Sequence, residues 1–153
     1  MNRLMLGSGA NRREGWVRLD ANPVYQPDIL ATIPPLPRAV TRRQWNEIEW
    51  IHGIEHFYPW EAEELLPKLR EVLAPGGRLV LEQPNFIHCC EAQNLRWIFG
   101  DSTFRDPLYG HRWGYTPRSL CAALKAAGFR RVLTGPVRYH NFPERDFRME
   151  AYK

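Results

Sequence analysis

The sequence predicts an α/β fold built on an open, mostly parallel sheet. Three observations support this class: short apolar runs recur along the chain, helical or turn segments separate them, and the last two runs enclose a loop that suits an antiparallel hairpin. The 153 residues include 44% hydrophobic and 25% charged side chains, values typical of a globular domain. We therefore expect residues 1–153 to form a single domain with its own core.

Four strands are expected in the first part of the chain. They cover residues 4–6, 16–20, 28–33 and 47–52. Gly7-Ser8-Gly9 follows the first run directly and predicts a tight turn where a ligand can approach the backbone. Residues 10–15 are too few to hold a full crossover helix before the second strand. A short basic helix is expected at 38–44.

The later elements continue the alternation. A helix is expected at 60–73, because one face carries apolar residues at helical spacing: Leu65, Leu66, Leu69, Val72 and Leu73. Ala74-Pro75-Gly76-Gly77 ends this helix, and a strand follows at 78–82. Thr116 and Pro117 predict the start of another helix, as N-cap and first residue. Strands at 131–133 and 147–152 follow, with a hairpin loop at 141–144, and residues 86–115 are expected to be irregular.

Three of these strands end on features that suit a ligand site. They are the Gly7-Ser8-Gly9 turn, Asp20 and His52. Open parallel sheets bind ligands beyond the carboxyl ends of their strands, so we expect these residues at one edge. A glycine pair after a strand is by itself a weak signal.

The combined pattern resembles a known family, the small single-domain class I S-adenosylmethionine-dependent methyltransferases of the type 11-like kind. The resemblance rests on motifs in this order: LMLGSGANRREGWVRLD, DILATIPPLP, NEIEWIHGIEHF, REVLAPGGRLVLEQPN and YTPRSLCAALKAAGF. It covers nearly the whole chain. It implies a Rossmann-like fold with a mostly parallel seven-stranded sheet, an antiparallel last strand, helices on both faces and a reduced N-terminal part.

The resemblance also implies which residues hold the cofactor, S-adenosyl-L-methionine, and its product S-adenosyl-L-homocysteine. Gly7, Ser8 and Gly9 match the motif that faces the methionine part. Asp20 matches the acid that binds the ribose hydroxyls, and an ionised carboxylate is suited to accept from a diol. Ala21 and Asn22 match positions beside the adenine, whereas Ile51 and His52 match the strand end that lines the methyl-donor pocket.

The chain departs from the family pattern at several positions. Asn11 occupies the third glycine position of the first motif, and Thr32 stands where an acid commonly meets the adenine amino group. Asn46 replaces an Asp that often begins the fourth strand. The link before Asp20 is short, and the chain starts at its first strand. These departures keep a second function open, that of a catalytically degenerate binding or regulatory module.

Two histidines are candidate catalytic groups. Methyl transfer mainly requires alignment of donor and acceptor, and a histidine near its ordinary pKa can act as a base for a hydroxyl or ammonium acceptor. His52 is a candidate base or substrate ligand. His56 is a candidate of the same kind, although Glu55 and His56 also suit a role in fixing their loop.

The acceptor site is expected in residues 86–115, where the family places acceptor-binding insertions. The stretch from Arg96 to Arg118 mixes arginines with aromatic residues, among them Phe104 and Arg105. We expect Arg112, Trp113 and Tyr115 to contact a small-molecule or glycan acceptor at an oxygen or nitrogen nucleophile. The alternative is that the aromatic residues belong to the core and the arginines are solvated.

Other classes are less favoured by the sequence. The net charge of +4 is compatible with an anionic substrate or nucleic acid and demands neither. A nicotinamide oxidoreductase is disfavoured, because no glycine-rich helix start follows Gly9. The three cysteines include His88-Cys89-Cys90, which fits no zinc spacing, so we expect no metal site. No membrane span or signal peptide is evident, and we expect a cytoplasmic protein of undetermined oligomeric state.

Overall fold

The computed structural model describes residues 1–101, 107–139 and 144–153. Phe104, Arg105 and the loop positions 141–143 singled out above lie outside these ranges. The described part forms a seven-stranded sheet with the order β3-β2-β1-β4-β5-β7-β6. Its strands are β1 (Arg3–Leu6), β2 (Trp16–Asp20), β3 (Ile29–Leu30), β4 (Trp45–Ile51), β5 (Leu73–Pro84), β6 (Arg131–Gly135) and β7 (Asp146–Tyr152).

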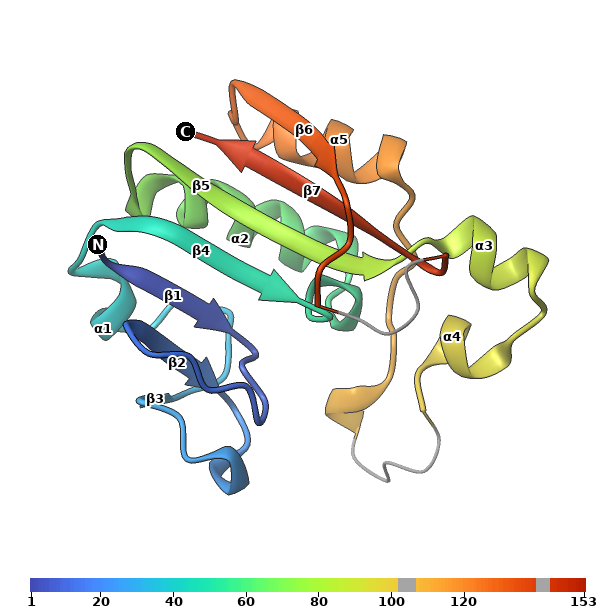
Figure 1. The fold of residues 1–153 in the computed structure, drawn as a ribbon, viewed down its shortest axis with the longest axis horizontal. Helices are drawn as coiled ribbons and strands as arrows, with labels where there is room; N and C mark the ends of the chain where they lie inside the picture. Colours follow the sequence, from blue (N-terminus) through green and yellow to red (C-terminus); the bar gives the residue numbers. More distant parts are fainter. Residues whose placement is uncertain (102–106, 140–143) are drawn as a thin grey trace.

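The strand directions agree with the prediction. β1, β2, β3, β4 and β5 pair in parallel, whereas β7 runs antiparallel to both β5 and β6. The sheet order reverses between β1 and β4, whose carboxyl ends lie side by side in Figure 1, and sheets of this kind bind ligands beyond such strand ends. The mostly parallel fold with an antiparallel last strand is confirmed.

The helices of the described residues are distributed unequally over the sheet. α2 (Pro59–Val72) and α5 (Pro117–Ala126) both lie behind it in Figure 1. One core cluster contains their apolar faces and the inward side chains of the strands, including Leu69, Leu124, Leu6 and Leu81. α1 (Arg38–Thr41) joins this cluster through Val40. We expected helices on both faces, but the links at 7–15 and 21–28 are too short for more than a turn of 3₁₀ helix, Pro23–Tyr25.

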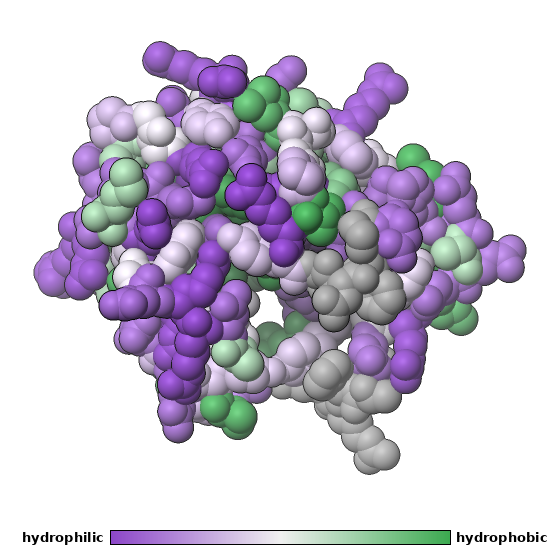
Figure 2. Space-filling model, in the orientation of Figure 1, coloured by the Kyte–Doolittle hydropathy of each residue, from purple (hydrophilic) through white to green (hydrophobic). Residues whose placement is uncertain are grey.

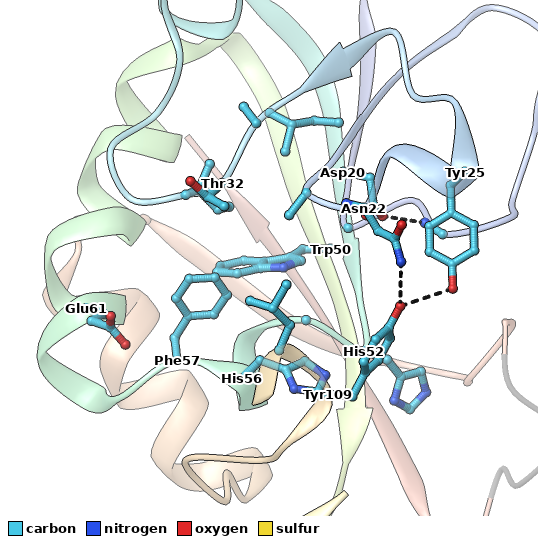
Figure 3. A pocket seen from close by; sticks show the side chains of 18 of the residues that line it. Asp20, Asn22, Tyr25, Thr32, Trp50, His52, His56, Phe57, Glu61 and Tyr109 are labelled. Carbon is cyan, nitrogen blue, oxygen red and sulfur yellow. Dashed lines mark hydrogen bonds between the residues drawn. The ribbon is translucent and has the colours of Figure 1, made fainter. Parts of the chain in front are cut away.

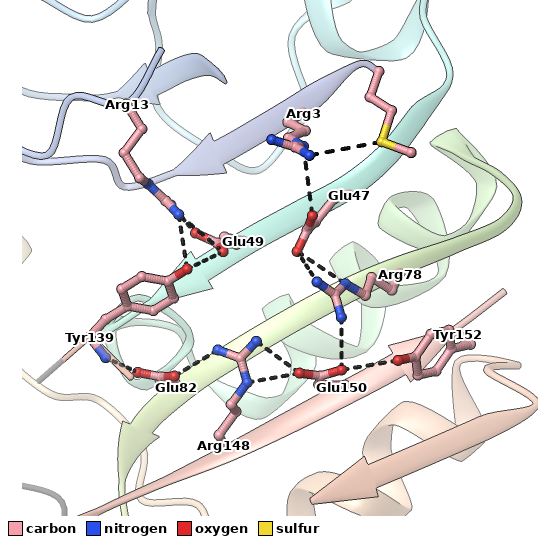
Figure 4. Close-up of polar contacts among 11 residues, drawn as sticks. Arg3, Arg13, Glu47, Glu49, Arg78, Glu82, Tyr139, Arg148, Glu150 and Tyr152 are labelled. Atoms are coloured by element: carbon pink, nitrogen blue, oxygen red, sulfur yellow. Dashed lines mark hydrogen bonds and ion pairs between the residues drawn. The ribbon is translucent and has the colours of Figure 1, made fainter. Parts of the chain in front are cut away.

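The opposite face of the sheet is polar within the described part of the chain. Its outward positions form a ladder of ion pairs across β1, β4, β5 and β7, made by Arg3, Glu47, Arg78, Glu150, Arg148 and Glu82 (Figure 4). Glu49 lies on the same face and pairs with Arg13. Figure 2 shows hydrophilic side chains over much of this side of the molecule. The alternation of apolar and charged residues therefore reflects a sheet with one apolar face and one polar face.

Several boundaries differ from the expectations. β3 is only Ile29–Leu30, because Pro34, Pro35 and Pro37 soon end extended pairing. β5 begins at Leu73, and Ala74–Gly77 lies within it where the register against β4 shifts. Residues 86–115 are not irregular throughout, since they hold α3 (Phe86–Glu91), α4 (Leu95–Phe99) and the 3₁₀ turn Pro107–Tyr109. Among the described residues, no helix is long and apolar enough to cross a bilayer.

Candidate functional site

A pocket of about 270 Å³ opens at the carboxyl edge of the sheet. It is walled by the β1 turn, the end of β2, the end of β4 and the segment around Tyr109 (Figure 3). Its lining residues are Gly7, Gly9, Leu19, Asp20, Ala21, Asn22, Tyr25, Ala31, Thr32, Ile33, Trp50, His52, Gly53, His56, Phe57, Glu61, Leu108, Tyr109 and Arg112. The space-filling view is hollowed below the strand ends (Figure 2).

The glycine turn and Asp20 form one polar unit. Gly7 and Gly9 have φ values of 60° and 52°, a region that glycine enters without cost. The Gly9 N–H donates to Asp20 Oδ2 at 2.8 Å, and the Asn22 N–H donates to Oδ1 at 2.8 Å. Both carboxylate oxygens are therefore held in place by backbone donors and keep further acceptor capacity toward the pocket.

Tyr109 closes one side of the pocket. Its hydroxyl accepts from Asn22 Nδ2 at 3.2 Å and lies 3.2 Å from the Tyr25 hydroxyl (Figure 3). These contacts tie the Pro107–Tyr109 turn to the loop after β2. The segment expected to bind the acceptor thus reaches the loop expected to bind the adenine.

The apolar floor of the pocket is built on Trp50. This indole is 1% exposed and packs edge-on against Phe57, with ring centroids 5.2 Å apart. Any Cβ at Gly53 would collide with the Trp50 ring, so only glycine fits at this position. The chain after β4 is therefore held close to the pocket floor.

His52 is held by two carboxylates. Its Nδ1 lies 3.3 Å from Glu55 Oε1, and its Nε2 lies 3.1 Å from Asp146 Oδ2. Burial favours the neutral ring, but the hydrogen bonds with Asp146 and Glu55 outweigh burial and raise the pKa of His52 to about 9. The residue also has a φ of 48°, an uncommon backbone conformation for a side chain of this size.

Glu55 and His56 lie on the next turn, Ile54–His56. Glu55 is 3% exposed, and the pKa of its carboxyl is lowered, because the hydrogen bond to His52 outweighs the effect of burial. His56 contacts His111 edge-to-face, with ring centroids 5.2 Å apart. Burial lowers the pKa of His111.

The structure brings most of the predicted cofactor residues to this pocket. Gly7, Gly9, Asp20, Ala21, Asn22 and His52 line it. Ser8 and Ile51 line a different cavity of about 260 Å³ near Arg13 and Tyr139. Ser8 follows β1 and Ile51 ends β4, and the alternation of side chains places both toward the polar face of the sheet.

The predicted acceptor residues are dispersed. Arg112 lines the pocket together with His56, and Trp113 lines a separate groove with Phe86 and Phe99. Tyr115 is 5% exposed and belongs to the hydrophobic core, so it does not line the pocket. Its aromatic ring packs in the core, which agrees with the alternative that the aromatic residues of this segment are core residues.

Some pocket residues were missed from the sequence. Tyr25, Trp50, Phe57, Glu61 and Tyr109 all line the pocket. Trp50 and Phe57 carry ordinary core signals, and nothing local distinguishes them from other buried aromatics. Tyr109 lies in the aromatic segment expected to bind the acceptor. Its contact with Asn22 spans 87 residues, so no local pattern indicates it.

The strand order and the pocket at its switch point define a Rossmann-like fold of the methyltransferase type. A family model described as a methyltransferase domain matches residues 10–134. The chain therefore belongs to the methyltransferase domain family, as its resemblance to class I S-adenosylmethionine-dependent enzymes implied. No curated protein sequence matches the chain.

Solved structures of similar fold include methyltransferases of low sequence identity. A SAM-dependent methyltransferase from Archaeoglobus fulgidus has a TM-score of 0.71 and 16% identity over 99% of this chain and 86% of its own. Human N-acetylserotonin methyltransferase in complex with SAM has a TM-score of 0.58 and 13% identity over 99% of this chain and 47% of its own. PigF with SAH has a TM-score of 0.65 and 12% identity over 99% of this chain and 50% of its own. The chain thus spans about half the length of the last two proteins.

Proposed function

We propose that this chain is an S-adenosylmethionine-dependent methyltransferase that acts on a small-molecule or glycan acceptor. One observation carries the proposal: the Asp20 carboxylate is fixed by the Gly9 and Asn22 N–H groups at the end of β2 and borders the pocket. A carboxylate held in this way suits a pair of ribose hydroxyl donors. The bound cofactor would supply an electrophilic methyl group on a sulfonium.

The residues of the pocket fit such a cofactor. The backbone of Gly7 and Gly9 would face its methionine part, with Ser8 completing the turn and Ile51 supporting the end of β4 from the other side. Ala21 and Asn22 would lie beside the adenine. Thr32, which lines the pocket, supplies a hydroxyl where an acid is common in the family.

The acceptor would approach from the side of His56 and Arg112. Tyr58 and Trp60 stack there with ring centroids 4.5 Å apart, and the Arg112 guanidinium lies 5.4 Å from the Tyr58 ring centroid. Trp60 is 60% exposed, so this rim offers a flat aromatic surface and a cation, which suit a sugar or an anionic acceptor. Trp113 would contribute only to a larger acceptor, through its neighbouring groove.

His52 would act as a cation rather than as a base. With a pKa of about 9, the ring is protonated at neutral pH. Both of its ring nitrogens are engaged by Glu55 and Asp146, so the cation would hold the chain after β4 in place, while alignment of the two substrates supplies most of the rate. His56 is then the remaining candidate for direct contact with the acceptor nucleophile.

The test is binding of S-adenosylhomocysteine. At about 1 mM ligand, the melting temperature of the full chain should rise, because ligand binding to the native state alone stabilises it. Asp20→Ala should lower the affinity measured by calorimetry by about 10- to 150-fold, the loss of a hydrogen bond to a charged group. Asp28→Ala is the matched control, since Asp28 lies at the far end of the loop that follows Asp20 and does not line the pocket.

Two outcomes would count against parts of the proposal. No thermal shift for the folded chain would overturn the cofactor assignment, and an unchanged affinity of Asp20→Ala would overturn the role of Asp20. Tight binding without turnover on sugar, phenol or amine acceptors would instead support the degenerate binding module.

A further inference from the structure

We propose that Glu55, His56 and His111 form a binding site for a divalent transition-metal ion of the zinc class. One ligand atom from each residue lies within 4.8 Å of the other two. This proposal departs from the expectation of no metal site, and it does not depend on the methyltransferase activity. The three residues come from the turn after β4 and from a segment more than fifty positions later.

The two histidines are oriented as metal ligands usually are. His56 Nδ1 lies 3.0 Å from the Gly110 carbonyl, and His111 Nδ1 lies 3.2 Å from the Trp97 carbonyl. A carbonyl oxygen only accepts, so each Nδ1 carries the proton and each Nε2 presents a lone pair. Backbone carbonyls are common second partners of zinc-bound histidines, because they fix the ring and its tautomer.

The carboxylate of Glu55 supplies the independent observation. Its side chain is 4% exposed, and its Oε1 contacts His52. Its Oε2 is buried and has no hydrogen-bond partner among the described residues. A buried carboxylate oxygen without a partner is costly, and a cation between Glu55 and the two imidazoles would remove that cost.

The donor set also agrees with ligation. Two imidazoles and a carboxylate form a donor set that suits zinc and neighbouring divalent ions, and three protein ligands leave one position for water or a substrate atom.

The backbone already holds the two segments together. The Arg112 and Trp113 N–H groups both donate to the Glu55 carbonyl, at 2.8 and 3.1 Å. Ligand atoms around a tetrahedral zinc ion are about 3.4 Å apart, so binding would draw the three side chains closer by small rotations. His56 lines the main pocket and His111 lines the groove with Trp113, so the ion would lie between the two.

The experiment uses the full chain after removal of metals by a chelator. Calorimetric titration with Zn²⁺ should show one tight site, and Co²⁺ should give visible absorption typical of a low-coordinate site. His111→Gln and Glu55→Gln should each weaken binding by more than about 100-fold, since loss of even a second-shell partner costs 10- to 100-fold. His88→Gln is the matched control, because His88 is exposed beside Cys89 and Cys90, and it should bind as the wild type does.

Absence of Zn²⁺ binding by the folded wild-type chain would overturn the site. Binding that survives in His111→Gln and Glu55→Gln but is lost in His88→Gln would also overturn it and would place the metal at the cysteines. If the variants do not fold, imidazole ¹⁵N spectra of the wild type decide. Zn²⁺ should shift Nε2 of His56 and His111, and no such shift would contradict the proposal.

Discussion

Asp20 and His52 show how single residues acquire their chemistry from close neighbours. Asp20 ends β2, and two backbone N–H groups fix both of its oxygens. His52 follows β4, and Glu55 and Asp146 turn an ordinary imidazole into a group with a pKa of about 9. The position of each residue at a strand end was predicted from sequence. The charge state of His52 was not, because Asp146 lies on the last strand.

Cys89 gives a prediction at the same scale. Burial raises the pKa of its thiol to about 11, whereas Cys90 is exposed. At about pH 8 a disulfide reagent should react promptly with Cys90 and Cys121 and slowly with Cys89, since the thiolate is the reactive form. Absorbance of the released chromophore measures the rapid and the slow phase of this reaction.

Variants assign the phases. Cys90→Ser should remove one rapid equivalent, and Cys89→Ser should remove only the slow one. Three rapid equivalents in the folded wild-type chain would show that Cys89 is accessible and that burial does not control its pKa.

At the scale of elements, α5 is the helix that follows its sequence signals most closely. The Thr116 hydroxyl accepts from the Ser119 N–H at 3.1 Å, and the Ser119 hydroxyl accepts from the Thr116 N–H at 2.9 Å. Pro117 occupies the first turn, where its missing N–H is not needed. Leu120 and Leu124 then reach the core. Local rules suffice here because all the partners lie within one turn.

Thr116→Ala should destabilise the chain by about 1 kcal/mol, the usual loss for an N-cap, because it leaves helix donors unpaired. Urea unfolding followed by circular dichroism measures the change. Thr41→Ala is the control, since the Thr41 hydroxyl makes only a 3.4 Å contact with the Arg38 carbonyl. Equal effects of the two substitutions would show that the cap does not stabilise α5.

At the scale of the whole molecule, the charged face of the sheet distinguishes this chain. Arg148 is 1% exposed, and it pairs with Glu82 at 2.7 Å and with Glu150 at 2.8 Å. Tyr139 and Arg13 extend over the same face and contact Glu49. The described residues place no helix over this ladder. The contacts that join the strands on this face are therefore ion pairs rather than apolar contacts. They satisfy buried polar groups across four strands.

The ladder predicts a loss of stability in acid. The hydrogen bonds of Glu150 with Arg148 and Tyr152 outweigh burial and lower the pKa of its carboxyl below 4.5. A lowered pKa stabilises the fold at pH values above 4.5, and this stabilisation disappears as the pH falls through the folded-state pKa. Glu150→Gln should therefore be less stable at neutral pH and should lose less stability on acidification.

Urea unfolding of both proteins between neutral pH and acid measures this difference. Glu64→Gln is the control, because the Glu64 side chain is 70% exposed and its pair with Lys68 is 3.9 Å long. That variant should retain the acid dependence of the wild type. Parallel curves for the wild type and Glu150→Gln would show that ionisation of Glu150 does not contribute to the acid dependence.

The amino-acid sequence by itself determined the order of the strands, the turn at Gly7-Ser8-Gly9, the acid at the end of β2 and the helix start at Thr116. These features depend on periodicity and on residues within a few positions of one another, which local physical rules describe well. The family could also be recognised from the sequence, since its motifs lie in continuous stretches of the chain. Tyr115 was assigned to the acceptor site because its segment is aromatic, and only packing shows that it belongs to the core.

The tertiary structure alone decided which distant residues meet. Tyr109 reaches Asn22 across 87 positions, and His56 meets Gly110 across 54. It also decided that the larger helices of the described residues share one face, leaving an ion-pair ladder on the other. Such contacts depend on how the sheet brings segments together, and no pattern within a window of sequence records that geometry.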